Sequence, residues 1–353
     1  MRLTALGVLV LALALGGGGC DSSAEEASPW VPWEVTPMPG VAAPADNPTT
    51  VEKVALGRLL FYDPVLGADG VTACATCHSE IWGMADGLPR SVGVGGGTLT
   101  GPGRVGPNVG RRNAQTLWNV GLRGELFWDG RVDTLEAQAL SPMHSEVELA
   151  RAPDAVVAEL ASLPEYVERF AAAFPNEPEP LSVVNLTRAL AAFERGLVSD
   201  RALYDAYVAG DAGAFSDDMV GGMARFAEAG CASCHVPPTF ESPRYAARGV
   251  GAGDDAGRFE ATGVEADRGA FRVPTLRNVR DSDPYFHDGS VADLEGAVRH
   301  ELSVSDEGFG DEDARLITVF LKKALMDRSR EPDRPDTVPS GLPVPEDGFR
   351  IPR

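Results

Sequence analysis

The chain has 353 residues, more than one ordinary hydrophobic core accommodates, so two domains are expected. Its 31 Lys and Arg against 52 Asp and Glu give a formal net charge of −21, which argues against a nucleic-acid partner and suits a basic protein partner. Hydrophobic residues make up 44% of the chain, enough for packed globular structure, and 40 glycines with 27 prolines predict long ordered loops.

The first twenty residues have the pattern of an export signal peptide. Arg2 supplies the positive start, residues 3–15 the apolar stretch, and "GGGGC" the small-residue end at Cys20. The apolar stretch is shorter than a membrane span usually requires. The pattern resembles a bacterial lipoprotein signal, which would anchor the protein to a membrane through a lipidated Cys20. Cleavage to a soluble periplasmic form is the alternative. Residues 21–48, rich in Pro, Ala and acids, are expected to form a flexible tether.

Helical periodicity dominates the rest of the chain. Apolar residues recur every three to four positions in seven segments, namely 51–62, 153–161, 164–174, 181–198, 217–230, 291–302 and 311–326. Pro153, Pro164 and Asp217 stand near the starts of three of these segments, where they favour helix entry. Alternating strand patterns are scarce, so the predicted fold class is mainly α with long ordered loops and little β-structure.

Two long stretches between the helices lack periodicity. Residues 86–116 are Gly-rich, and residues 236–271 are similar. Loops of this length are usually functional or disordered, and the position of each beside a cysteine motif favours function. Residues 331–353 are rich in Pro and Asp, which predicts an extended tail that lies on the surface or is mobile.

The four cysteines that follow Cys20 are confined to two C-x-x-C-H motifs. They are Cys74, Cys77 with His78, and Cys231, Cys234 with His235. This is the attachment signature of c-type haem, because two thiols one helical turn apart can reach both porphyrin vinyl groups while the adjacent histidine ligates iron. A Cys2His2 zinc site needs its histidines several residues apart, and a thioredoxin-like dithiol needs a βαβ context. Two covalent haems are therefore favoured over zinc or redox dithiols.

The distance between the motifs indicates one haem in each of two domains. We expect an N-terminal haem domain over 49–205 and a C-terminal haem domain over 206–330. The two are too dissimilar outside C-x-x-C-H to form a simple repeat.

Further motifs stand between and after these two sites in a specific order. They are "GMADG", "GRRNAQTLWNV", "LFWDGR", "LEAQAL", "VEL", "FRVPTLRNV" and "DPYFHDGS". This order resembles the bacterial dihaem cytochrome c peroxidase family, including its MauG-type branch, over roughly residues 50–325. The resemblance implies two cytochrome c-like helical domains that share an interface, with two covalent haem c groups and a calcium ion.

The resemblance also implies an activity and partners. Family peroxidases reduce hydrogen peroxide to water at the N-terminal haem. The C-terminal haem accepts electrons from a small donor protein, a c-type cytochrome or a cupredoxin. A periplasmic location is expected, and a homodimer is possible because family members are often dimers.

Residue by residue, the resemblance assigns roles at the two haems. His78 and His235 match the proximal iron ligands. Trp128, in "FWDGR", matches the tryptophan between the haems, where it can shorten the electron path. Gln138 and Glu148 match the distal pair, since a carboxylate can move a proton between the peroxide oxygens and an amide can orient the bound peroxide. Glu146 is the rival acid if the register slips.

Three further positions match the family's calcium ligands. Asn113 would contribute its side-chain oxygen, and Ser282 and Pro284 their backbone carbonyls, a hard-oxygen set that suits calcium. His287, in "PYFHDG", is expected to support the C-terminal haem rather than to ligate its iron.

Two departures from the family pattern concern the iron ligands. Val94 stands where many members carry a histidine that caps the peroxidatic iron, and Met84 is the only other conventional ligand nearby, so a five-coordinate iron is predicted without prior reduction. At the C-terminal haem, the sixth-ligand position of the peroxidases' methionine or the MauG-type tyrosine holds Glu301. His300 precedes it and is the favoured ligand on chemical grounds, with Glu301 or no protein ligand as alternatives.

Three functions are therefore weighed. The leading interpretation is a dihaem peroxidase. A MauG-like oxidase that withdraws electrons from a protein side chain is favoured by the open iron but lacks the tyrosine ligand. A non-catalytic dihaem carrier or redox sensor is disfavoured, because a carrier has no use for the distal Glu148.

Overall fold

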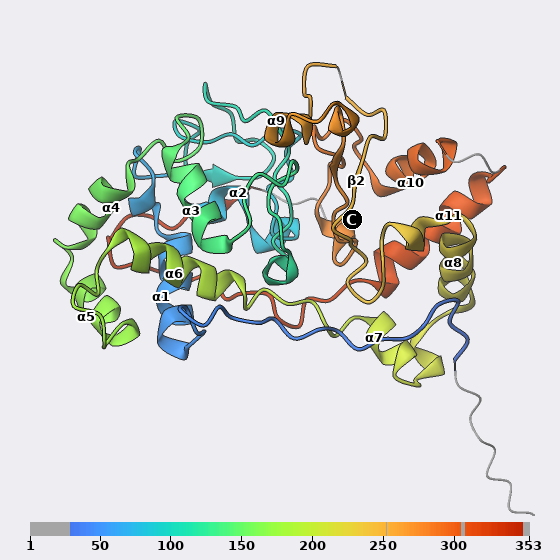
Figure 1. Ribbon diagram of the computed structural model, residues 1–353, viewed down its shortest axis with the longest axis horizontal. Coiled ribbons are helices and arrows are strands. Elements are labelled where there is room, and N and C mark those ends of the chain that lie inside the picture. Colours follow the sequence, from blue (N-terminus) through green and yellow to red (C-terminus); the bar gives the residue numbers. More distant parts are fainter. Residues whose placement is uncertain (1–28, 252, 305–307, 349–353) are drawn as a thin grey trace, which may run out of the picture.

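The computed structural model describes residues 29–251, 253–304 and 308–348. The expected export signal, Cys20 and residues 21–28 lie outside the described residues. Helices gather in an N-terminal and a C-terminal half, joined by extended chain (Figure 1). None of the helices within these described ranges is long and apolar enough to cross a membrane.

Short helices and long connections make up both halves. The N-terminal half contains α1 (Val51–Tyr62), α2 (Cys74–Cys77), α3 (Leu135–His144), α4 (Pro153–Leu160), α5 (Pro164–Ala173) and α6 (Val183–Glu194). The C-terminal half contains α7 (Leu203–Val208), α8 (Asp217–Glu228), α9 (Phe259–Thr262), α10 (Leu294–Ser303) and α11 (Asp311–Val319), which continues as a π-helical turn over Phe320–Ala324. The predicted class, mainly α with little β-structure, is confirmed.

The described strands are two residues long and form two separate pairs. β1 (Leu99–Thr100) runs parallel to β4 (Glu346–Asp347), and β2 (Tyr245–Ala246) runs antiparallel to β3 (Phe271–Arg272). The first pair joins segments almost 250 residues apart, so it fixes the C-terminal tail to the N-terminal half rather than building a sheet.

Capping residues explain where the observed helices differ from the predicted ones. The segment expected at 181–198 is shorter, because the Ser182 side chain accepts a hydrogen bond from the Asn185 N–H and starts α6 there. Asp293 caps α10 in the same way, so this helix begins three residues later than predicted. Helix α3 was not predicted, since Pro142 lies inside it and interrupts the sequence pattern.

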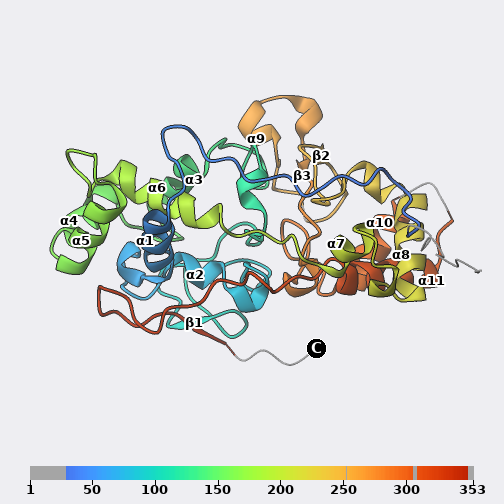
Figure 2. The ribbon, with the colours of Figure 1, turned by 90° about the horizontal axis from the view of Figure 1, so that it is seen from below.

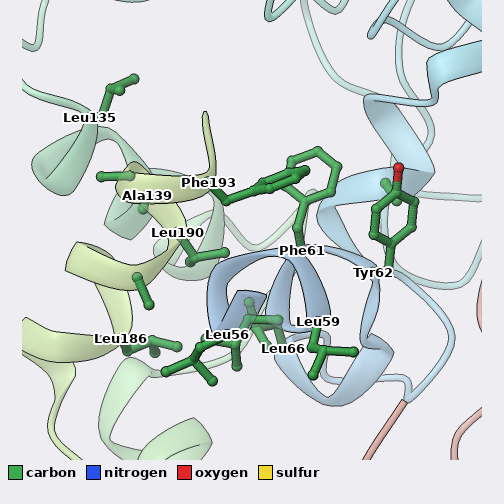
Figure 3. Close-up of a cluster of buried hydrophobic side chains, with 14 of the residues drawn as sticks. Leu56, Leu59, Phe61, Tyr62, Leu66, Leu135, Ala139, Leu186, Leu190 and Phe193 are labelled. Atoms are coloured by element: carbon green, nitrogen blue, oxygen red, sulfur yellow. The ribbon is translucent and has the colours of Figure 1, made fainter. Parts of the chain in front are cut away.

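The core of the N-terminal half forms where α1 crosses α6. Leu56 and Phe61 on α1 pack against Leu186 and Leu190 on α6 (Figure 3). The two backbones approach so closely that a Cβ built on Gly57 would lie 2.0 Å from the carbonyl oxygen of Ala189. Glycine at this point of α1 is therefore a packing requirement.

The C-terminal half is built in the same way from α8 and α11. A Cβ on Gly222 would lie 2.2 Å from the carbonyl oxygen of Leu316. Phe226, Phe240 and Phe320 form an aromatic cluster with ring centroids 5.6–6.1 Å apart. Apart from Val338, the first core is built from residues 56–197 and the second from residues 204–325, and the predicted boundary after residue 205 lies within α7.

The flexible tether predicted for residues 21–48 does not describe residues 29–48, which pack along both halves (Figure 2). The Trp33 indole N–H donates to the Tyr204 hydroxyl at 2.9 Å, and its ring lies edge-on to Phe226 and Phe240. Further on, Asn47 donates to Glu136 at 2.7 Å. The Pro-rich composition of this segment predicted a free tether. The side chains of Trp33 and Asn47, however, have partners on the folded halves.

The C-terminal tail crosses in the opposite direction and covers the N-terminal half (Figure 2). Arg334 pairs with Glu80, Val338 joins the N-terminal core, and the Ser340 hydroxyl donates to Asp63 at 2.6 Å. Asp347 accepts from the hydroxyls of Ser79 and Thr100, both at 2.6 Å. Of the two alternatives for residues 331–353, the described part, 331–348, follows the surface-lying one.

Candidate haem sites

One cavity of the described structure lies beside the first C-x-x-C-H motif. It has a volume of about 490 Å³ and is lined by Cys74, Cys77 and His78 together with Gln138 and Glu148. The motif comes from α2, Gln138 from α3, and Glu148 from the turn that follows α3. Residues separated by more than sixty positions thus share one cavity.

A single helical turn positions the first motif. The Ala73 N–H donates to the Thr76 hydroxyl at 2.9 Å, and the His78 N–H donates to the Cys74 carbonyl at 3.0 Å. The His78 ring is oriented by its Nδ1, which lies 3.0 Å from the carbonyl oxygen of Met84. A ring held through Nδ1 offers Nε2 to the cavity, which is the arrangement of a histidine that ligates a metal. Met84 contributes its backbone here, and its side chain is buried.

Burial sets the protonation of these groups. It raises the pKa of the Cys74 thiol to about 12 and raises that of Cys77 as well, while it lowers the pKa of His78. The thiols are therefore neutral and the imidazole is an uncharged potential ligand. A large cavity with neutral thiols and an oriented imidazole along one wall fits a covalently attached haem c.

The predicted distal pair, Gln138 and Glu148, lines the same cavity. The Glu148 N–H donates to Ser145 O at 3.2 Å, and the Glu148 carbonyl accepts from the Val94 N–H at 2.9 Å. Burial raises the pKa of Glu148, partly offset by a hydrogen bond with Ser145 and the charge of Arg131. Glu146, the rival acid, is exposed and does not line the cavity. The structure therefore brings Glu148 rather than Glu146 to Gln138 and His78.

Val94 lies in a loop that packs tightly on the Glu148 turn. Its side chain is buried, and a Cβ on the preceding Gly93 would lie 1.9 Å from the carbonyl oxygen of Val147. The loop therefore supports the backbone of Glu148, and its side chain at position 94 is aliphatic.

One residue of this cavity escaped the sequence analysis. Glu194, the last residue of α6, lines the same cavity, is 6% exposed, and its Oε2 has no hydrogen-bond partner among the described residues. Burial raises its pKa to about 8, against the opposing charge of Arg195. The sequence feature that could have identified Glu194 is its position at the end of "LAAFE", where an acidic residue follows an otherwise apolar helix segment.

Trp128 is shared between the two cavities. It lines the first and the second, and its indole N–H donates to the Asn113 carbonyl at 3.0 Å. Trp128 therefore borders the cavities of both C-x-x-C-H motifs.

The second cavity, of about 360 Å³, lies beside "CASCH" and is lined by Cys231, Cys234 and His235. His235 Nδ1 is 3.1 Å from the carbonyl oxygens of both Phe240 and Pro274, so its Nε2 is again the nitrogen offered to the cavity. Burial raises the pKa of the Cys231 thiol to about 12 and lowers that of His235. This site repeats the thiol-and-imidazole wall of the first.

The two candidate sixth ligands of this second site point in different directions. Glu301 lines the cavity, whereas His300 does not. His300 Nε2 lies 2.8 Å from the Arg248 carbonyl oxygen, and the ring sits edge-on to Phe286. His287 also lines the cavity, stacked on Phe271 with ring centroids 3.6 Å apart. Of the pair, geometry favours Glu301 over the chemically preferred His300.

The predicted calcium ligands come from two segments that meet. The Asn113 N–H donates to the His287 carbonyl at 2.7 Å, which joins the segment of Asn113 to the one that contains Ser282 and Pro284. Asn113 Nδ2 donates to Leu88 O at 2.7 Å, which leaves its Oδ1 available to a cation. The described part of the chain holds no group of three or more His, Cys, Asp or Glu placed for a metal ion, and the calcium site stays a prediction.

Comparison with known proteins identifies the family. Residues 51–213 match the model of the di-haem cytochrome c peroxidase family. The chain is 41% identical over 265 residues to the methylamine utilization protein MauG of Methylorubrum extorquens, covering 74% of this chain and 72% of that protein. It is 34% identical over 308 residues to the cytochrome c551 peroxidase of Pseudomonas aeruginosa, covering 84% of each. The chain belongs to the di-haem cytochrome c peroxidase family.

A solved structure supports the fold of this peroxidase-family protein. A MauG-like protein associated with microbial copper homeostasis superposes with a TM-score of 0.72 at 29% identity, covering 86% of this chain and 97% of that one. The family membership and the two cavities together identify the chain as an oxidoreductase of the cytochrome c peroxidase class with two covalent haem c groups.

Proposed function

We propose that this protein reduces hydrogen peroxide to water at the N-terminal haem, with electrons delivered through the C-terminal haem from a small donor protein. The observation that carries the proposal is the lining of the first cavity, which brings Gln138 and Glu148 into the same cavity as His78. An electron carrier needs the histidine but neither of the other two side chains.

Glu148 is the proton-transfer group in this proposal. The overall conversion of one peroxide to two waters consumes two electrons and two protons. The haem supplies the iron at which peroxide binds and the electrons that cleave its O–O bond. Glu148 takes a proton from one peroxide oxygen and delivers it to the other, and Gln138 orients the peroxide by hydrogen bonding. Burial raises the pKa of Glu148 above its ordinary value, in the direction that favours a carboxyl acting as both acid and base.

Trp128 provides the route for electrons in this proposal. Its indole borders both cavities, so it lies between donor and acceptor and shortens the path through space. The donor is a c-type cytochrome or a cupredoxin in the periplasm, and a basic face on that donor would complement the net charge of −21. Calcium held by Asn113, Ser282 and Pro284 would stabilise the contact between the two halves.

A MauG-like oxidase that acts on a protein substrate is the second candidate. The 41% identity to the methylamine utilization protein MauG favours it, as does Val94 in place of a capping histidine. Both functions use a peroxide-accessible N-terminal iron, so they differ only in where the electrons come from. Non-catalytic electron transfer is the third and is disfavoured by Glu148.

Peroxide turnover with a reduced c-type cytochrome tests the proposal. The wild type is compared with Glu148→Gln, which keeps the shape of the side chain and removes the carboxylate. We expect the variant to lose about 10²–10⁴-fold in kcat. Glu146→Gln, two residues away and exposed, is the matched control and should retain wild-type turnover.

Each alternative predicts a different result. Absence of turnover in the wild type, with peroxide still bleaching the haem spectrum, would favour the protein-directed oxidase. Absence of both would favour the carrier. Wild-type turnover in Glu148→Gln would contradict its role as the proton-transfer group. A ferric spectrum with a high-spin component at the N-terminal haem is expected as isolated, and two low-spin six-coordinate haems would contradict the open iron.

A further inference from the structure

Among the described residues that line the second cavity, the possible iron ligands other than His235 are engaged by other groups. Among its lining residues, the Tyr285 hydroxyl donates to Val279 O at 3.0 Å, and the His287 ring is stacked on Phe271. His300, the strongest potential ligand nearby, lies outside the lining and donates to a backbone carbonyl. The carboxylate of Glu301 is the remaining candidate.

Glu301 is engaged by an arginine that lines the same cavity. Arg248 Nε donates to Glu301 Oε2 at 2.7 Å, and a terminal guanidinium nitrogen lies 2.6 Å from the same oxygen. A carboxylate in a charge-assisted pair of this geometry is a poorer metal ligand, because its electron density is directed at the guanidinium. The pair thus holds Glu301 in competition with iron ligation.

Arg248 can also hold an anion inside the cavity. Its guanidinium lines the cavity beside Glu301 and presents several N–H donors in a fixed plane. An anion that binds in the cavity can therefore take the place of the Glu301 carboxylate as the partner of Arg248.

We propose that the C-terminal haem site binds a small exogenous anion that takes the place of Glu301 at the Arg248 guanidinium, so that both haem sites of this protein bind external ligands. The ligand class is a small anion that coordinates ferric iron, such as cyanide, azide or hydroperoxide. The proposal requires haem at "CASCH" but does not rest on peroxide reduction at the first site, since ligand binding is measured without turnover.

An equilibrium cyanide titration of the purified ferric protein, carrying both haems, tests this. Binding is followed by visible absorption and electron paramagnetic resonance, which resolve the two haems. We expect two cyanides per chain. A stoichiometry of one, with the C-terminal haem unchanged, overturns the proposal. Either result is obtained whether or not the protein turns over peroxide, so it is separate from the proposed function.

Substitutions locate the second cyanide. Arg248→Leu should weaken it by about tenfold or more while the first stays unchanged, since a charge-assisted contact to the anion is lost. Arg299→Leu on the exposed face of α10 is the matched arginine control and should leave both affinities unchanged. Equal weakening by both substitutions contradicts a specific role for Arg248.

Two further variants test the ligand assignment directly. Glu301→Met introduces the ligand that family peroxidases use, so it should convert the C-terminal haem to a low-spin form and remove the second cyanide. His300→Asn should leave the ferric spectrum unchanged. If His300→Asn instead removes a bis-histidine spectrum, His300 is the sixth ligand and the proposal fails. Haem content by the pyridine haemochrome assay verifies that each variant carries two haems.

Discussion

The two halves of this molecule pack their helices in the same way but differ in the side chains that line their cavities. Each crosses two helices at a glycine, and each orients a C-x-x-C-H histidine through Nδ1 and a backbone carbonyl. In addition to that histidine, the first cavity is lined by Gln138 and Glu148, whereas the second is lined by Glu301, which is held by Arg248. The C-x-x-C-H residues are common to both cavities, and we propose that the residues that differ determine what each haem does.

The largest expected effect tests the shared construction. Gly57→Ala and Gly222→Ala each place a Cβ about 2 Å from a backbone oxygen, so one helix must shift. Alanine favours the helix by about 1 kcal/mol, yet we expect a net loss of about 3 kcal/mol of unfolding free energy for each variant. Urea denaturation measures it.

Gly221→Ala is the matched control for these glycines, because its Cβ meets only a leucine methyl at 3.7 Å. It should be neutral or slightly stabilising. If Gly222→Ala is as well tolerated as Gly221→Ala, close helix approach is not what requires glycine in α8.

A smaller effect on stability is expected from Glu194, which lines the first cavity and not the second. Glu194 has a pKa of about 8 in the folded protein against an ordinary value of 4.5, so the folded state binds a proton that the unfolded state releases. The free energy of unfolding should therefore fall as pH rises from about 4.5 to about 8, by an amount on the order of 2 kcal/mol. Glu194→Gln should remove this part of the pH dependence and be more stable than wild type near pH 8.

Denaturation of wild type and Glu194→Gln at pH 5 and pH 8 measures the difference. The exposed Glu146→Gln should follow the wild-type profile. A parallel profile for Glu194→Gln and wild type would show that Glu194 is ionised in the folded protein.

The smallest expected effect concerns the residue that joins the cavities. Trp128→Phe keeps an aromatic ring but loses the hydrogen bond to Asn113 O. We expect electron transfer from a prereduced C-terminal haem to the N-terminal haem to slow by about tenfold, equivalent to about 1.4 kcal/mol of activation free energy. Stopped-flow absorption measures this rate, and Trp30→Phe on the exposed surface serves as control. An unchanged rate in Trp128→Phe would assign Trp128 to packing alone.

Much of the fold was predictable because its signals are local. Helices at 51–62 and 217–230 follow from apolar spacing and from Thr50 and Ser216 as capping residues. Helix α3 was not, since Pro142 interrupts its pattern, and neither was the packing of residues 29–48. That segment is held by Trp33 against Tyr204, a contact over 171 positions that no local pattern encodes.

The sequence by itself determined how haem is attached and which family the chain resembles. The chemistry of C-x-x-C-H depends on residues within one helical turn, and the motif order is a linear property. Only the tertiary structure decided that Glu148 rather than Glu146 reaches the first cavity, and that Glu301 rather than His300 reaches the second. It also brought in Glu194, a residue without a motif. The physical reason is that the side chain facing a cavity is set by the rotation of its helix and by distant partners such as Arg248. The residues adjacent in the sequence determine neither of these.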